Sequence, residues 1–401
     1  MMIPSNIHHL LRLSSFFLLG TSAWILVNGI LYAEIPIIVA ALDYDYTVVS
    51  TITLCVTLSN IAPLLWSAIA DVRGKAETQV GIGIVLALGL ATTSSLSLTD
   101  AALQKTSLVA VSVCVGIVGT MSPVLLFPHA SSSIDQITAM ASGTAIANLF
   151  AAVLAIIQLT GNEEGRFSIQ VYFGILTAVF GLAIVGFIGT LRFQKNTLGE
   201  DKVVGTNKLG DAFHDEDDQD GEEHQPPAKK LFWSPFFTTT MEHFHVNAAQ
   251  FVLNALTFFL VPGVVPFSIQ HFPGSNSILH YLTVSQILAQ TFGILLSGKW
   301  QYSKVWIQIL AVVVVWIPTV VLSILNDEVF HETQVNAVLP ITLIVILNFL
   351  YGYSSTNFFH LVTSKSADAS QSARVLGAWN QLGAMSGSLV GYFLVHNKVI
   401  Q

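Results

Sequence analysis

Apolar runs of about 20 residues recur almost from one end of this 401-residue chain to the other. About twenty helical residues cross the hydrocarbon core of a bilayer, so each run is long enough to span a membrane. The chain is 53% hydrophobic and only 10% charged, whereas soluble proteins carry about 25% charged residues. The sequence therefore predicts an all-α polytopic membrane protein.

The apolar runs fall into two groups, one on each side of a long polar stretch. About eleven transmembrane helices are predicted, six before the polar stretch and five after it. The predicted spans are 12–33, 47–70, 79–98, 107–128, 137–159, 169–192, 246–267, 278–297, 305–325, 337–360 and 373–395. This division predicts an N-terminal half at 1–192 and a C-terminal half at 236–401.

The polar stretch, residues 193–235, contains a run of acidic residues at 215–223. Like charges in a row repel one another and bury no apolar surface, so this segment is predicted to be a disordered linker between the halves. A regulatory docking site is the alternative interpretation.

The Lys and Arg residues predict the orientation of the chain. With the N-terminus in the cytoplasm, 13 of the 16 basic residues fall on the cytoplasmic side and 3 on the other. Cytoplasmic loops of membrane proteins carry this excess of positive charge. Eleven spans then place the C-terminus outside the cell.

Enzyme signatures are absent from the sequence. It contains no P-loop, no G-x-S-x-G and no H-E-x-x-H motif. Glu242, His243 and His245 are of the types that bind metal, but they stand at a helix entrance where polar residues are ordinary. We therefore predict a protein that is not an enzyme and has no metal or cofactor.

Uncharged polar and aromatic side chains recur inside the predicted spans, whereas Lys and Arg are nearly absent from their centres. The amides are Asn28, Asn60, Asn148, Asn254, Gln286, Gln290, Asn348, Asn357, Asn380 and Gln381, and the aromatic residues include Trp24, Phe127, Phe258, Tyr351, Tyr353 and Trp379. Carriers of anions usually face their substrate with a cation or with helix N-termini. Stacking surfaces with neutral hydrogen-bonding groups instead suit an uncharged, planar, polar solute. The alternative is that each amide only bonds a neighbouring helix.

The first span carries the densest cluster of such residues. Trp24, Asn28 and Leu31 share a helical face by their spacing, and Glu34 and Pro36 follow. An amide in hydrocarbon needs a partner or a wet cavity, so this face is predicted to meet the substrate. Contact with another helix and the membrane interface is the alternative.

The segment between the second and third spans, Ser67 to Lys75, resembles the loop signature of the major facilitator superfamily, G-x-L-a-D-R-x-G-R. Asp71, Gly74 and Lys75 fit the signature. Ser67 and Val72 depart from it. Together with the 6+5 layout, this favours a major-facilitator-like carrier with two rocking halves.

The first span also resembles the first helix of the animal riboflavin transporters, solute carrier family 52. That family carries a pattern of the type G-x-x-S-W-x-x-V-N-G-I-x-x-E-L-P there, and this chain reads G-T-S-A-W-I-L-V-N-G-I at 20–30, with E-I-P at 34–36. One residue is added between the asparagine and the glutamate, and isoleucine replaces leucine. Further similarity lies at 123–128, 254–257 and 381–387, whereas Thr144 and Val265 replace glutamines of the family.

The resemblance implies eleven helices and riboflavin uptake by alternating access across the plasma membrane. Trp24 and Phe127 would stack on the isoalloxazine ring, while Asn28, Asn254 and Gln381 would bond its polar edge or the ribityl chain. For coupling or gating, the candidates are Glu34, Asp71 and Arg73. The expected partners are riboflavin and the lipid bilayer, without nucleic acid. The alternatives are an equilibrative nucleoside-like carrier and a non-transporting receptor or scaffold.

Overall fold

The computed structural model describes residues 5–42, 45–70, 76–98, 105–159, 166–206, 233–260, 264–269, 272, 274–324, 337–397 and 399. The described part is helical throughout. Its helices are α1 (Ser5–Gly20), α2 (Ile25–Asn28), η1 (Gly29–Ala33), α3 (Ile35–Ala41), α4 (Thr47–Leu58), α5 (Ile61–Ala70), α6 (Ala76–Ser97), α7 (Lys105–Met121), η3 (Ser122–Leu126), α8 (Phe127–Ala130), α9 (Ile134–Leu159), α10 (Ile169–Thr206), α11 (Trp233–Glu242), α12 (Phe244–Leu260), η4 (Val265–Ser268), α13 (Ser275–Lys299), α14 (Val305–Ile324), α16 (Val338–Lys365) and α17 (Ala369–His396). The acidic run at 215–223 and the segment 71–75 lie outside the described residues.

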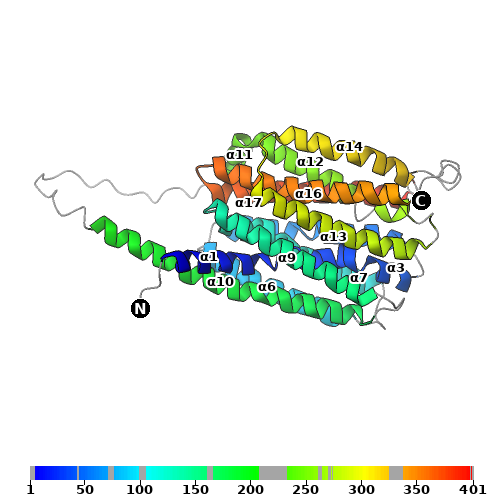
Figure 1. Ribbon diagram of the computed structural model, residues 1–401, viewed down its shortest axis with the longest axis horizontal. Helices are drawn as coiled ribbons and strands as arrows, with labels where there is room; N and C mark the ends of the chain where they lie inside the picture. Colours follow the sequence, from blue (N-terminus) through cyan, green and yellow to red (C-terminus); the bar gives the residue numbers. More distant parts are fainter. Residues whose placement is uncertain are drawn as a thin grey trace, which may run out of the picture.

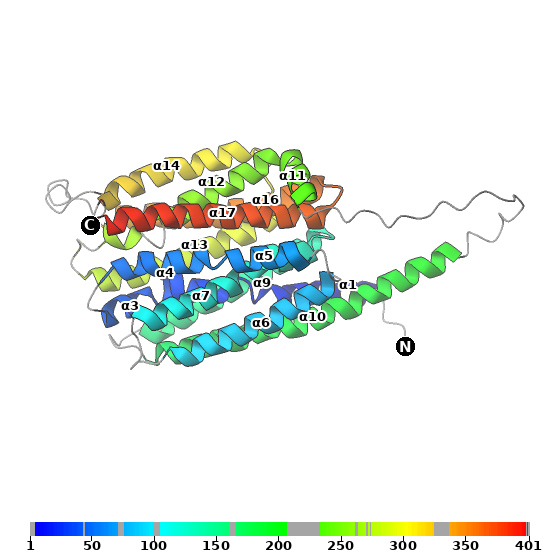
Figure 2. The same ribbon diagram turned by 180° about the vertical axis from the view of Figure 1, so that it is seen from behind.

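The long helices run side by side in one bundle (Figures 1 and 2). Within the described part, ten helical segments are long and apolar enough to cross a membrane, and they match the first ten predicted spans. The eleventh, α17, has 28 residues and packs along α12 and beside α16. Its buried polar residues, among them Asn380, Gln381 and Ser388, make it less apolar than the others. The predicted fold class of about eleven helices is confirmed.

The two ends of the chain lie at opposite ends of the bundle (Figure 1). We call these the N-terminal and the C-terminal end of the bundle. This placement fits an odd number of crossings. Helix α10 projects beyond the bundle at the N-terminal end and continues to Thr206 (Figure 2). The first residues of the segment predicted as a disordered linker, 193–206, are therefore helical.

The two predicted halves contact each other through paired helices. Helix α9 packs against α13, and α4 packs against α17. At the second contact, Asn60 donates a hydrogen bond of 2.5 Å to Gln381 and accepts one from Thr120. A buried hydrogen bond between amides therefore joins the two halves in the interior of the bundle.

A further contact joins the halves at the C-terminal end of the bundle. The Tyr46 ring lies 6.1 Å from the Phe267 ring, and its hydroxyl lies 3.5 Å from that of Ser275. The neighbouring Asp45 accepts a 2.5 Å hydrogen bond from Lys105. Although burial raises the pKa of Asp45, its hydrogen bonds to Lys105 and Thr47 outweigh burial and lower it. The Asp45 carboxylate is thus ionised at neutral pH and forms an ion pair with Lys105 at the surface.

Gly383, Gly387 and Gly391 recur every four residues in the sequence, which predicts a face of small residues that packs closely on another helix. Helix α17 approaches α12 through this face. A Cβ at Gly383 or Gly387 would clash with the backbone carbonyl of Phe251 or Ala255, and one at Gly391 would lie 2.8 Å from that of Phe259. Small residues allow such close backbone approach between membrane helices. The prediction of close helix packing on this face is confirmed.

Candidate functional site

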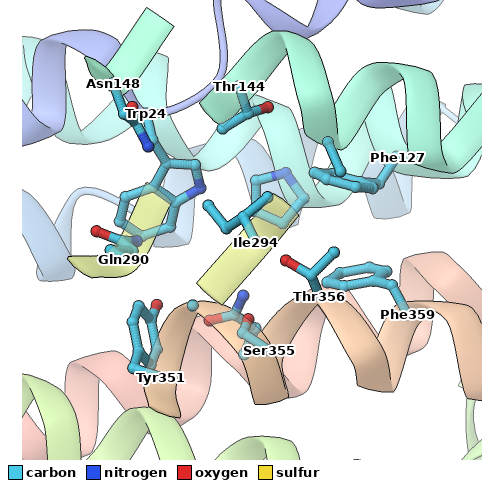
Figure 3. Close-up of a pocket in the computed structure, with 14 residues that line it drawn as sticks. Trp24, Phe127, Thr144, Asn148, Gln290, Ile294, Tyr351, Ser355, Thr356 and Phe359 are labelled. Carbon is cyan, nitrogen blue, oxygen red and sulfur yellow. The ribbon is translucent and has the colours of Figure 1, made fainter. Parts of the chain in front are cut away.

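A cavity lies between the two halves and is lined by residues of both (Figure 3). The space that the centre of a water molecule can occupy in it is about 50 Å³. Such a volume holds a few water molecules and not a fused three-ring solute. The wall consists of Trp24, Pro123, Phe127, Ala141, Thr144, Asn148, Gln290, Ile294, Tyr351, Gly352, Ser355, Thr356, Phe359 and Asn380.

Trp24 reaches the cavity because the first span is broken at this residue. Helix α1 ends at Gly20, and Trp24 has φ 64° and ψ −7° at the start of α2. It is the only non-glycine residue with positive φ in the described part of the chain. A left-handed conformation costs a bulky residue about 1–2 kcal/mol, and such strain clusters at functional sites. The strained backbone at this break therefore indicates a functional role for Trp24.

The last carbonyl groups of α1 accept hydrogen bonds from side chains as well as from the backbone. Thr21 and Ser22 donate from their hydroxyls to Leu18 and Leu19 of the preceding turn. The Thr144 hydroxyl, on α9, donates to the Gly20 carbonyl at 3.1 Å. Thus Thr144 both lines the cavity and holds the broken helix.

The fourth span is irregular where it borders the cavity. It passes from α7 into the π-helical turn η3 and then into α8. Pro123 and Pro128 lie in this region, and proline removes a helical hydrogen bond. Wide π-helical turns often occur at functional sites. The irregular turn carries Phe127 into the wall.

Aromatic rings from both halves meet at the two ends of the cavity (Figure 3). Phe127 stacks on Phe359 with ring centroids 4.8 Å apart and an angle of 26°. Both residues lie late in spans that run towards the N-terminal end of the bundle. Towards the other end, the Trp24 ring lies 6.0 Å from that of Phe258, which lies 6.3 Å from that of Tyr351. Aromatic side chains of both halves therefore flank the cavity in both directions.

The polar part of the wall carries no charge. Its side chains are amides and hydroxyls, and no Lys, Arg, Asp or Glu is among the described residues that form it. The Tyr351 hydroxyl donates to Asn254 Oδ1 at 3.1 Å, and Gln250 donates to the Ser355 hydroxyl at 3.1 Å. This lining suits a neutral solute with an aromatic plane and a polar edge.

Two of the five predicted substrate-binding residues, Trp24 and Phe127, form part of the cavity wall. Asn28, Asn254 and Gln381 are not among the wall residues. Asn254 contacts the wall residue Tyr351, and Gln381 bonds to Asn60 across the halves. Asn28 is buried, and its amide has no hydrogen-bond partner among the residues that the structure describes.

None of the three residues predicted for coupling or gating is among the wall residues. Glu34 is fully buried next to Gln158 and Tyr172 within the N-terminal half. Its role stays a prediction. Asp71 and Arg73 lie outside the described residues.

Several wall residues were not predicted as site residues, although the sequence contains their signal. Asn148, Gln290, Tyr351 and Asn380 belong to the set of amides and aromatics inside the spans. Residue type alone did not show which of them face the same space. Phe359 has no such signal, because a phenylalanine in an apolar span is ordinary.

A match to a protein-family profile shows which family the chain belongs to. The sequence profile of solute carrier family 52, riboflavin transporter, matches residues 8–400. The chain belongs to the solute carrier family 52 riboflavin transporters. No curated protein matches the sequence of this family member closely.

Three solved transporter structures are similar to that of this family member, and one of them, XylE, belongs to the major facilitator superfamily. The proton:xylose symporter XylE has a TM-score of 0.59 at 11% identity, with 98% of this chain and 88% of that chain covered. A mutant of the nucleoside transporter NupG has a TM-score of 0.51 at 13% identity, with coverages of 96% and 91%. A bacterial homologue of the human lysosomal transporter Spinster has a TM-score of 0.50 at 13% identity, with coverages of 98% and 82%. These similarities show that the chain shares their fold.

Proposed function

We propose that this protein carries riboflavin across the plasma membrane by alternating access. The observation that carries the proposal is the uncharged cavity between the halves, with aromatic residues at both ends and amides along its wall. Membership of the riboflavin transporter family supports this substrate. Carriers with two halves bind their solute near the membrane midplane and rock around it.

The small volume of the cavity fits an intermediate of such a cycle. Aromatic contacts between the halves flank it at both ends, through Phe127 and Phe359 and through Trp24, Phe258 and Tyr351. A flavin ring enters only after one set of contacts separates. Opening of either end while the other stays closed gives the alternation that transport requires.

The absence of charge from the described wall predicts selectivity against the phosphate ester of riboflavin. Riboflavin is neutral in its ring and ribityl chain, whereas its 5′-phosphate carries close to two negative charges at pH 7. An unpaired anion is costly to bury, and about 1.4 kcal/mol corresponds to tenfold in affinity. The ester should therefore compete at least about tenfold more weakly than riboflavin.

Competition against uptake of labelled riboflavin measures this preference in cells that express the chain. Lumiflavin, which keeps the ring and lacks the ribityl chain, should still compete. Uridine and adenosine test the alternative of a nucleoside carrier and should compete weakly. If the phosphate ester competes as well as riboflavin, a basic group faces the substrate and the proposed cavity is not the binding site.

The proposal places the N-terminus in the cytoplasm and the C-terminus outside the cell. The excess of Lys and Arg on one side supports this orientation. An epitope added after Gln401 should be stained by antibody on intact cells, and one added before Met1 only after permeabilisation. The reverse pattern would contradict the orientation.

A further inference from the structure

The polar side chains of the cavity wall differ in whether a substrate can use them. The hydroxyls of Tyr351 and Thr144 already donate to Asn254 and to the Gly20 carbonyl. Asn148 differs from these two, because neither Oδ1 nor Nδ2 has a hydrogen-bond partner among the residues that the structure describes. Asn380 of the wall has a buried, unpaired Oδ1 there but no such Nδ2, so Asn148 is the wall amide with both polar atoms buried and unpaired in the described part. The Asn148 amide thus offers the wall an unused donor group at Nδ2 and an unused acceptor at Oδ1.

An unpaired amide of this kind needs an explanation. Asn148 is fully buried in α9, and buried polar groups in folded proteins are nearly always hydrogen-bonded. Leaving both atoms unpaired costs free energy that a leucine at the same position would not cost. A partner that arrives with the substrate explains why the amide lies on the wall.

The position of Asn148 indicates which part of a substrate it would meet. It lies beside Trp24, on the same side of the cavity (Figure 3). Indole faces stack on planar rings. A ring that lies against Trp24 therefore presents its edge, and not its face, to groups that flank the indole.

We propose that Asn148 recognises the imide edge of the flavin ring and so determines specificity. This inference rests on the proposed function. In the flavin ring, the N3–H group lies between two carbonyl groups. Asn148 Oδ1 would accept from N3–H, while Nδ2 donates to one of the neighbouring carbonyl oxygens. Both unused groups of the amide then find a partner.

Methylation of the ring at N3 tests this pairing directly, because the methyl group removes the donor and occupies the place of the acceptor. Sites built around a hydrogen bond reject analogues that lack it. For the native chain, 3-methylriboflavin should compete with labelled riboflavin at least about tenfold more weakly than riboflavin, which is about 1.4 kcal/mol. In Asn148→Leu, competition by riboflavin should weaken towards that of the methylated analogue. The ratio of the two competition strengths should then fall to within about threefold.

Asn348→Leu is the matched control. Asn348 is also fully buried, its Oδ1 also has no partner in the described part of the chain, and it does not belong to the cavity wall. In this variant, the ratio between the competition strengths of riboflavin and 3-methylriboflavin should stay at the native value. Asn148→Ala, which leaves the space open, replaces Asn148→Leu if the leucine variant does not reach the cell surface.

The outcomes separate this inference from the proposed function. A native chain that transports riboflavin but accepts 3-methylriboflavin equally well would show that no group reads the imide edge. A ratio that stays at the native value in Asn148→Leu and Asn148→Ala would show that another residue reads it. Either result overturns the role of Asn148 and leaves the carrier intact, whereas a native chain that takes up no riboflavin overturns the proposed function itself.

Discussion

Replacement of Gly377 by valine is expected to lower riboflavin uptake at least about tenfold. Gly377 lies on α17 where this helix meets η3 of the other half, and a Cβ there would clash with the backbone carbonyl of Pro123. Overpacking costs about 1–3 kcal/mol, and about 1.4 kcal/mol shifts an equilibrium tenfold. The clash acts on the conformation in which the halves touch at this point, so the carrier should lose that conformation and keep its fold.

The Gly377→Val effect is measured as uptake divided by the amount of protein at the cell surface. Gly181→Val is the control, because a Cβ at Gly181 would meet no described atom within 4 Å. It introduces the same side chain into another membrane helix and should transport at close to the native rate. Native uptake by Gly377→Val would show that the contact between α17 and η3 does not form during the cycle.

The second large effect is expected at Trp24, where backbone and side chain can be tested separately. Trp24→Ala and Trp24→Gly both remove the indole. Each should reduce uptake at least about tenfold, because the flavin ring loses the surface on which it stacks. The positive φ of 64° is strained for alanine and not for glycine. Purified Trp24→Gly should therefore be more stable than Trp24→Ala by about 1 kcal/mol.

Thermal unfolding of the two purified variants measures the backbone effect, and uptake measures the side-chain effect. Trp24→Phe keeps an aromatic ring and should retain part of the uptake. Equal or greater stability of the alanine variant would contradict the left-handed conformation at Trp24. Native uptake in Trp24→Ala would show that the indole is not part of the binding site.

The arrangement of spans could be predicted from the sequence, because hydropathy and helix length are local properties. Ten predicted spans coincide with helices of suitable length and composition, and α17 completes the bundle. The glycines at 383, 387 and 391 predicted the close contact of α17, because only small residues allow it. These features do not depend on how the helices are rotated.

The composition of the cavity wall could be predicted only in part, because it depends on helix rotation and on breaks. Trp24 and Asn28 share a face in a regular helix. However, Trp24 is left-handed, and a π-helical turn begins at Gly29, so Trp24 lines the cavity and Asn28 does not. Gln381 has a suitable side chain, but Asn60 of the other half occupies its oxygen. Partners that lie far away in the sequence decided these positions.

Uptake into liposomes that contain only the purified chain tests the central claim most directly. We expect saturable uptake of labelled riboflavin, blocked by unlabelled riboflavin and lumiflavin and at least about tenfold less by the 5′-phosphate. Uptake should fall in Trp24→Ala and Gly377→Val and persist in Gly181→Val. Riboflavin accumulation no greater than in protein-free liposomes, with the chain folded and inserted, would contradict the proposed function.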